Sequence, residues 1–327
     1  MLKKTNLNLS HLVYLLNKSG YHNGISLGRD LGISRAAVCK LIQKLKDYDI
    51  QIDSVKKKGY ALLEPLILLD RIKIQEYLMT TDITIDLFER LSSTNDYLKL
   101  LDHSGNPRIC LAEQQTHGRG RLARRWHSPF AQNIYFSCIY YFEKDISELA
   151  GLSLIVSLAV VTMLKHFQLS DVQIKWPNDV FYNGQKLSGS LIEIEAETHG
   201  ICRAIIGIGI NINMLNDQGG NISQEWTSMR IITKQYMDRN KICALLIDTL
   251  FAYLKKFSTH GLSIFQHEWQ SVDLLFNKIV NLKNGTQDYT GRVTGINHLG
   301  NLLLEIRHGT IKAFSSGDTS IVKPGLY

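Results

Sequence analysis

The sequence predicts an α+β protein of several domains: a winged helix-turn-helix over residues 1–65, a central α/β domain over 66–275 and a small β-barrel over 276–327. Three observations lead to this prediction. The chain has 327 residues, which is long for one ordinary domain. Its excess of positive charge lies at the N-terminus. Its pattern changes from helices with one hairpin, to alternating strands and helices, and then to short strands separated by glycine turns.

The charge is distributed unevenly along the chain. The net charge is +7, and residues 1–64 contain 11 lysines and arginines against 5 acidic residues, which leaves about +1 for the remainder. A basic module attached to a nearly neutral body is typical of a nucleic-acid-binding domain joined to another activity.

The first module has the pattern of a helix-turn-helix. Apolar residues between 27 and 45 follow the helical period, Gly32 provides a turn, and Ser34 is placed to cap a second helix. That arrangement puts the second helix into the major groove of DNA, and the strand-like runs at 50–55 and 59–64 form a wing. The residues expected to contact DNA are Ser34, Arg35, Ala36, Lys40 and Lys44 on the helix and Lys56, Lys57 and Lys58 on the wing. A small protein-interaction module with solvated lysines is the alternative.

The stretch RLSSTNDYLKLL, residues 90–101, predicts a strand end, a turn and a helix. Ser93, Thr94 and Asn95 lie near the start of that helix, where free backbone N–H groups can meet a small polar or anionic ligand. Simple helix capping is the alternative.

The loop EQQTHGRGRLARRWHSP, residues 113–129, contains four arginines. Gly118 and Gly120 let the backbone approach a ligand, while Arg119 and Arg121 offer forked donors suited to carboxylate or phosphate. Surface charge or nucleic-acid contact is the common role of such clusters. Gln115 and Trp126 flank the loop and favour a buried small-molecule site.

Two later segments predict further walls of such a site. In IKWPNDVFYNGQKLSGSLIEI, Pro177 ends a strand, Asn183-Gly184 forms a hairpin turn, and Lys186 begins the returning strand, where it can reach a pocket or remain solvated. In AIIGIGININ, residues 204–213, isoleucines alternate with Gly207, Gly209, Asn211 and Asn213. A face without bulk predicts that a ligand or a packed element lies directly on the backbone.

Other features restrict the class of protein. The apolar stretch from Leu149 to Leu164 is shorter than a membrane span of about 20 residues, which favours a buried helix and no membrane partner. The N-terminal residues lack the pattern of a secretory signal, so we expect a cytoplasmic protein. The five cysteines are scattered, which favours reduced thiols over disulfides or a zinc site. Neither a Walker A sequence nor a G-x-G-x-x-G turn occurs.

Five motifs occur in the chain in this order: SSTN, QTHGRGR followed by RRW, KWPND, QKLSG and GIGIN. With the helix-turn-helix in front of them, the whole chain resembles the bifunctional biotin protein ligases, which also repress the biotin operon. The resemblance implies a class II synthetase-like α/β ligase domain and an SH3-like C-terminal barrel; a purely structural cap is the alternative for the barrel. It implies that biotin and ATP give biotinoyl-AMP, from which biotin passes to a lysine of the biotin carboxyl carrier protein of acetyl-CoA carboxylase. It also implies that the adenylate favours a homodimer bound to operator DNA, and that Mg²⁺ accompanies ATP without a dedicated protein site.

The resemblance assigns roles to the residues that match the family's motifs. Those expected to bind biotin are Ser93, Thr94, Asn95, Gln115, Gly118, Arg119, Gly120, Arg121, Lys186, Gly189, Leu191 and Gly207. Those expected to bind ATP or the adenylate are Arg119, Arg121, Trp126, Lys186, Asn211 and Trp226. Lys186, Arg119 and Arg121 are expected to be catalytic.

Two loops and one departure from the family's motif bear on the expected binding of the adenylate. Residues 116–128 and 214–226 are expected to close over the adenylate. The family's loop commonly has glycine where this chain has Ala123, and a positive φ there would strain the alanine.

Two rival functions share these features. One is a transcription factor that senses biotin without catalysis, and the other is a lipoate ligase, against which GRGR and KWPND favour biotin.

The basic module generates the first prediction. Binding to DNA should weaken steeply as salt rises, by roughly 100-fold between about 50 and about 200 mM if about four phosphates are contacted, because each contact releases counterions. Titration of the full-length protein with duplex DNA at several salt concentrations measures this slope. Affinity that does not change with salt would contradict the DNA-binding interpretation.

Overall fold

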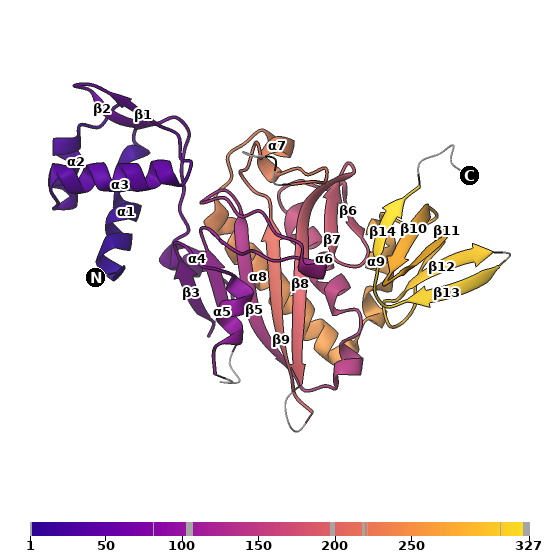
Figure 1. Cartoon of the computed structure of the whole chain (residues 1–327). Helices are drawn as coiled ribbons and strands as arrows, with labels where there is room; N and C mark the ends of the chain where they lie inside the picture. Colours follow the sequence, from indigo (N-terminus) through magenta and orange to yellow (C-terminus); the bar gives the residue numbers. More distant parts are fainter. Residues whose placement is uncertain are drawn as a thin grey trace.

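The computed structural model describes residues 2–80, 82–102, 107–196, 200–217, 220, 222–307 and 309–322. A small helical domain and a small all-β domain lie at opposite ends of a central sheet (Figure 1). The predicted multidomain α+β class is confirmed, since each part has the kind of secondary structure that the sequence indicated.

The N-terminal domain is a helix-turn-helix with a wing. Its elements are α1 (Leu2–Leu16), α2 (Gly24–Leu31), α3 (Arg35–Asp47), β1 (Ile52–Val55) and β2 (Gly59–Leu62). Gly32 ends α2 with a φ of +63°, and the side chain of Ser34 caps α3 by accepting a hydrogen bond from Ala37 N at 3.2 Å. The sequence pattern predicted α2, α3 and the wing, but it did not predict α1.

The central domain contains a seven-stranded sheet in the order β3-β4-β5-β9-β8-β7-β6. Its strands are β3 (Thr84–Phe88), β4 (Arg108–Ala112), β5 (Ile134–Phe142), β6 (Val172–Lys175), β7 (Asp179–Tyr182), β8 (Gln185–Ala196) and β9 (Cys202–Ile210). Among the described strands of this sheet, β3 and β4 pair in parallel and the other neighbours pair antiparallel. The predicted Asn183-Gly184 turn joins β7 to β8. Long β8 and β9 lie near the middle of the sheet and run antiparallel, which gives the domain a rigid centre.

Helices cover the sheet unequally. They are α4 (Arg71–Tyr77), α5 (Thr94–Lys99), α6 (Leu152–Lys165), α7 (Met229–Thr233), α8 (Arg239–His260) and α9 (Gln266–Val272), with short 3-10 turns at Arg121–Ala123, Ile146–Leu149 and Ser263–Phe265. The main core joins α6 and α8 to the sheet face that carries Ile206 and Ile208, while α5 packs on the opposite face beside Ile205. That second face is only partly covered, which leaves room for a site.

One stretch in the described part of the chain, residues 146–165, is long and apolar enough to cross a membrane. Most of it is buried, because α6 packs against the sheet and α8. This placement agrees with the expectation of a buried helix.

The C-terminal domain is a five-stranded antiparallel sheet in the order β13-β12-β11-β10-β14. The strands are β10 (Ile279–Asn284), β11 (Gln287–Ile296), β12 (Leu302–Arg307), β13 (Thr310–Phe314) and β14 (Asp318–Ile321). Trp176 Nε1 of the central domain donates a buried hydrogen bond of 3.0 Å to Gly300 O, so the two domains are joined close to the KWPND segment. The predicted limits at residues 65 and 275 fall in connecting segments, after β2 and after α9.

A buried ion pair anchors the segment that connects the first two domains. Arg239 and Glu113 lie 2.7 Å apart with exposures of 0% and 4%. Glu113 also accepts a hydrogen bond from Leu69 N, and Arg239 donates to Ile67 O at 2.8 Å. The pair therefore fixes residues 67–69 against the central domain.

Loss of either charge should destabilise the protein strongly. Glu113→Gln preserves the shape but leaves Arg239 buried without its counter-ion, so the free energy of unfolding should fall by about 3–5 kcal/mol. Denaturant unfolding measures the change. Glu148→Gln, which breaks an exposed pair with Lys144 but can keep the capping hydrogen bond from Asp145 N, is the control and should have no measurable effect.

Candidate functional site

A cavity of about 510 Å³ opens on the sheet face that carries α5. Arg119, Arg121 and Lys186 come from separate segments and all line it. The other predicted residues that line it are Ser93, Thr94, Asn95, Gln115, Gly120, Trp126, Gly189, Leu191, Gly207, Asn211 and Trp226. Gly118 is buried behind the lining, where a Cβ would approach Trp126 O within 2.7 Å.

The floor of the cavity is the backbone of β8 and β9. A Cβ at Gly207 would collide with the Asn95 side chain, and a Cβ at Gly209 would collide with the Trp126 ring. The side chains of Asn95 and Trp126 therefore lie directly on the glycine face of β9, where the sequence predicted a ligand or a packed element. A larger residue at either glycine would displace a wall of the cavity.

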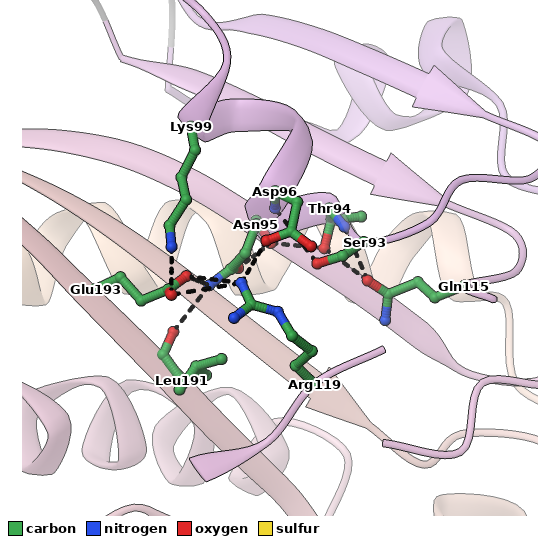
Figure 2. Close-up of polar contacts among 10 residues, drawn as sticks. Ser93, Thr94, Asn95, Asp96, Lys99, Gln115, Arg119, Leu191 and Glu193 are labelled. Atoms are coloured by element: carbon green, nitrogen blue, oxygen red, sulfur yellow. Dashed lines mark hydrogen bonds and ion pairs between the residues drawn. The ribbon is translucent and has the colours of Figure 1, made fainter. Parts of the chain in front are cut away.

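The start of α5 supplies one wall. Ser93 caps the helix, and Gln115 Oε1 accepts hydrogen bonds from Thr94 N at 2.9 Å and Thr94 Oγ1 at 3.1 Å. Asn95 Nδ2 donates to Glu193 Oε2 at 2.9 Å, as Figure 2 shows. Ser93, Thr94 and Asn95 are each less than 5% exposed, so this wall is largely fixed.

Each of the three cations has a polar partner beside the cavity. Arg119 pairs with Asp96 and, at 3.3 Å, with Glu193. Arg121 Nη1 donates to Asn178 Oδ1 at 3.1 Å, and burial lowers the pKa of its guanidinium, which still remains charged at neutral pH. The cations are thus held in place within the protein itself.

Lys186 is more buried than Arg119, whose side chain is 38% exposed. Its Nζ is 2.8 Å from Asp179 Oδ1 and 5.5 Å from the centre of the Trp126 ring, and its side chain is 13% exposed. Its backbone pairs with the segment around Trp226, since Lys186 N donates to Glu225 O at 3.0 Å and Thr227 N donates to Lys186 O at 2.9 Å. The strand therefore positions Lys186 and the Trp226 segment together.

The two loops expected to close over a ligand are close to one another. His127 Nε2 lies 3.7 Å from Asp217 Oδ1, which connects residues 116–128 to residues 214–226. Burial lowers the pKa of His127, which favours the neutral imidazole. Residues 218, 219 and 221 of the second loop lie outside the described residues.

The arginine loop contains the strain that the substitution at Ala123 suggested. Leu122 and Ala123 have φ values of +54° and +56°, in the left-handed region that favours glycine. Arg124, the next residue, forms an ion pair with Asp318 of the C-terminal domain. Arg121, which bonds to Asn178, and Arg124 therefore fix the two ends of a strained turn.

Four polar residues that contact the three cations were not assigned by sequence reasoning: Asp96, Asn178, Asp179 and Glu193. The first three stand inside or beside the SSTN and KWPND motifs, so a signal was present. Glu193 had none, because a charged residue in the alternating run SLIEIEA is typical of any solvated strand face.

The predicted DNA-contacting residues divide into two groups. Ser34, Arg35, Ala36 and Lys40 are exposed on α3, and Lys56, Lys57 and Lys58 are exposed at the tip of the wing. Lys44 differs, because it forms an ion pair with Glu89 of the central domain. Beside it, Tyr48 stacks on Phe130 with ring centres 4.1 Å apart. Lys44 therefore belongs to the contact between domains in this structure.

Three family models match separate parts of the chain. The Biotin/lipoate A/B protein ligase family matches residues 87–211, an HTH domain matches 8–61, and the Biotin protein ligase C terminal domain matches 275–322.

Relatives match nearly the whole chain. The Bifunctional ligase/repressor BirA of Salmonella typhimurium is 36% identical over 95% of this chain and 96% of the relative. The protein of the same name from Escherichia coli is 35% identical over 95% and 96%, and that from Bacillus subtilis is 30% identical over 93% and 96%. Among solved structures, the biotin protein ligase of Aquifex aeolicus in complex with biotin and ATP is similar, with a TM-score of 0.63 and 29% identity, over 73% of this chain and 99% of that chain.

The strained turn generates a prediction of its own. Ala123→Gly should raise the free energy of unfolding by about 1 kcal/mol, because glycine adopts a positive φ without the clash of a Cβ. Denaturant unfolding measures it. Ala36→Gly is the matched control, since the same change in the helical backbone of α3 should have the opposite sign.

Proposed function

Because this chain belongs to the family of bifunctional ligase/repressor proteins, we propose that it joins biotin to a carrier protein and represses transcription through its helix-turn-helix. It is an ATP-dependent biotin ligase with a DNA-binding repressor domain. The observation that carries this function is the convergence of Arg119, Arg121 and Lys186 in one cavity beside the Ser93–Asn95 wall.

The first reaction brings together two negatively charged groups. The carboxylate of biotin attacks the α-phosphorus of ATP, an oxygen–phosphorus bond forms, and pyrophosphate leaves. The repulsion between carboxylate and phosphate contributes to the barrier, and Lys186, Arg119 and Arg121 would neutralise it. No nucleophilic side chain is needed, so the protein's contribution is position and charge.

The acidic residues of the site hold those cations in position. Asp179 beside Lys186, and Asp96 with Glu193 beside Arg119, keep the positive groups close together before ligands enter. An incoming carboxylate or phosphate would share or replace these partners. The stabilising charge is therefore in position when the reaction begins.

The second reaction transfers biotin from the adenylate to a lysine amine of the biotin carboxyl carrier protein, and AMP leaves. The adenylate must be protected from water until that lysine arrives. Trp126 over Gly209 and the Trp226 segment paired with Lys186 are the parts that would cover it, together with Asn211, whose amide is held by Thr227 O at 3.0 Å.

Mg²⁺ would accompany the nucleotide and offset the charge of the leaving pyrophosphate. In the described part of the chain, His, Cys, Asp and Glu form no cluster of three that could hold a metal. Asp179 is the carboxylate that lines the cavity, and one carboxylate with phosphate oxygens and water suits Mg²⁺. Asp179 is therefore the residue that would contact it.

The remaining roles follow from the same proposal. The exposed basic residues of α3 and the wing would bind operator DNA, and the adenylate would act as corepressor by favouring a homodimer. Both roles would require the protein to work in the cytoplasm.

Lys186→Ala tests the ligase mechanism. Adenylate formation should fall by roughly 100-fold or more, because a preorganised charge is removed from the reacting groups. Release of pyrophosphate from ATP in the presence of biotin measures it, and the melting temperature checks the fold. Lys255→Ala, an exposed lysine on α8, is the control and should retain activity. Near-normal pyrophosphate release by Lys186→Ala would contradict the assignment.

One experiment separates the rival functions. The protein is incubated with biotin, Mg-ATP and a fragment of the carrier protein, and the modified lysine is sought by mass spectrometry. A biotin sensor without catalysis would bind biotin and modify nothing. A lipoate ligase would support exchange between pyrophosphate and ATP with lipoate instead of biotin.

A further inference from the structure

Glu193 on β8 connects three groups beside the Ser93–Asn95 wall of the cavity. Its Oε1 accepts a hydrogen bond from Lys99 Nζ at 2.5 Å, its Oε2 accepts one from Asn95 Nδ2 at 2.9 Å, and Arg119 Nη2 lies 3.3 Å from Oε2. Figure 2 shows these contacts converging on one carboxylate. Glu193 is not among the described residues that line the cavity, so it contacts the wall from behind.

The first consequence concerns the orientation of Asn95. Its amide could be rotated by half a turn with little change in shape, but a carboxylate only accepts hydrogen bonds. Glu193 therefore selects the orientation that places Nδ2 toward β8, where Leu191 O lies 3.4 Å away. In that orientation Oδ1 lies 2.6 Å from Ser137 Oγ, and the whole amide is fixed.

The second consequence concerns Arg119. Within the described part of the chain, the hydrogen bonds of its guanidinium all run through Nη2, to Asp96 and Glu193. Nε and Nη1 carry the other three N–H groups of the planar fork. Because the side chain is 38% exposed, these two carboxylates are what restrict it to the edge of the cavity.

The carboxylate of Glu193 remains ionised at neutral pH. Burial alone would raise its pKa, but hydrogen bonds from Lys99 and Asn95, with the nearby charge of Arg119, outweigh burial and lower the pKa. The carboxylate thus remains an acceptor for all three partners under ordinary conditions.

We infer that Glu193 is a positioning residue for biotin, which orients the Asn95 amide and the Arg119 guanidinium without touching the ligand. The inference rests on the proposed function, in which Asn95 and Arg119 bind biotin. The alternative role is an ion pair with Lys99 that only stabilises the strand. The experiment below distinguishes the two.

The test uses the full-length Glu193→Gln variant. Glutamine keeps the size of the side chain but loses the charge and one acceptor oxygen, so Asn95 and Arg119 lose their common anchor. Calorimetric titration with biotin in the absence of ATP should show a dissociation constant raised roughly tenfold, and the KM for biotin in pyrophosphate exchange should rise equally. The KM for biotin should rise more than the KM for ATP, because Glu193 orients two biotin-binding side chains but reaches the nucleotide only through Arg119.

Two control variants isolate the effect. Glu195→Gln changes a glutamate on the same strand and face, which pairs with Arg203 instead, and it should leave biotin binding unchanged. Lys99→Met removes the outer partner of Glu193 and should change biotin binding by no more than about twofold. A loss in Lys99→Met as large as that in Glu193→Gln would overturn the inference in favour of the stabilising ion pair.

The remaining outcomes are also decisive. Biotin binding that is unchanged in Glu193→Gln, with an active wild-type protein, overturns the inference but leaves the ligase function intact. A wild-type protein that neither binds biotin nor exchanges pyrophosphate overturns the proposed function itself. If Glu193→Gln melts at a much lower temperature, Glu193→Asp replaces it, because aspartate keeps the charge but is one methylene group too short to reach all three partners. A dissociation constant raised about threefold supports the inference, and no change contradicts it.

Discussion

The site depends on holding several positive side chains in one small cavity without a ligand. Arg119, Arg121 and Lys186 would repel one another if they were left unpaired in a space of about 510 Å³. Carboxylates of the same chain reduce that repulsion, because Asp179 pairs with Lys186 and two acids pair with Arg119, while the neutral amide of Asn178 holds Arg121 in place. The protein thereby provides in advance the charge that two reacting anions require, and ligand binding becomes an exchange of partners.

The second constraint is a flat floor on a rigid support. The isoleucines of β9 face the core with α6 and α8, so the strand cannot move freely, while the glycines on its other side admit Asn95 and Trp126 to the backbone. A site on the central strands of a sheet is more precise than one on loops alone. The loops at 116–128 and 214–226, which approach one another at His127 and Asp217, are the segments that we expect to close over a bound molecule.

Much of this arrangement could be predicted from local patterns. The Gly32 turn, the Ser34 cap, the Asn183-Gly184 hairpin and the two faces of β9 depend on neighbours in sequence, which periodicity and turn chemistry describe well. The grouping of distant motifs into one pocket came from family resemblance instead. Helix α1, the contact of Lys44 with Glu89 and the role of Glu193 depend on tertiary packing, and no local pattern distinguishes such residues from solvated ones.

The same packing links the ligand site to the DNA-binding domain. Phe130 and Ala131, which follow directly on the arginine loop, are buried in the hydrophobic core of the N-terminal domain. Glu89, shortly before the Ser93–Asn95 wall, binds both Lys44 and the hydroxyl of Tyr48 at the end of α3. A ligand that reorders residues 116–128 therefore acts on a segment whose far end is fixed in the DNA-binding domain. If the ligand and DNA favour the same position of α3, then by linkage each raises the affinity for the other by the same factor.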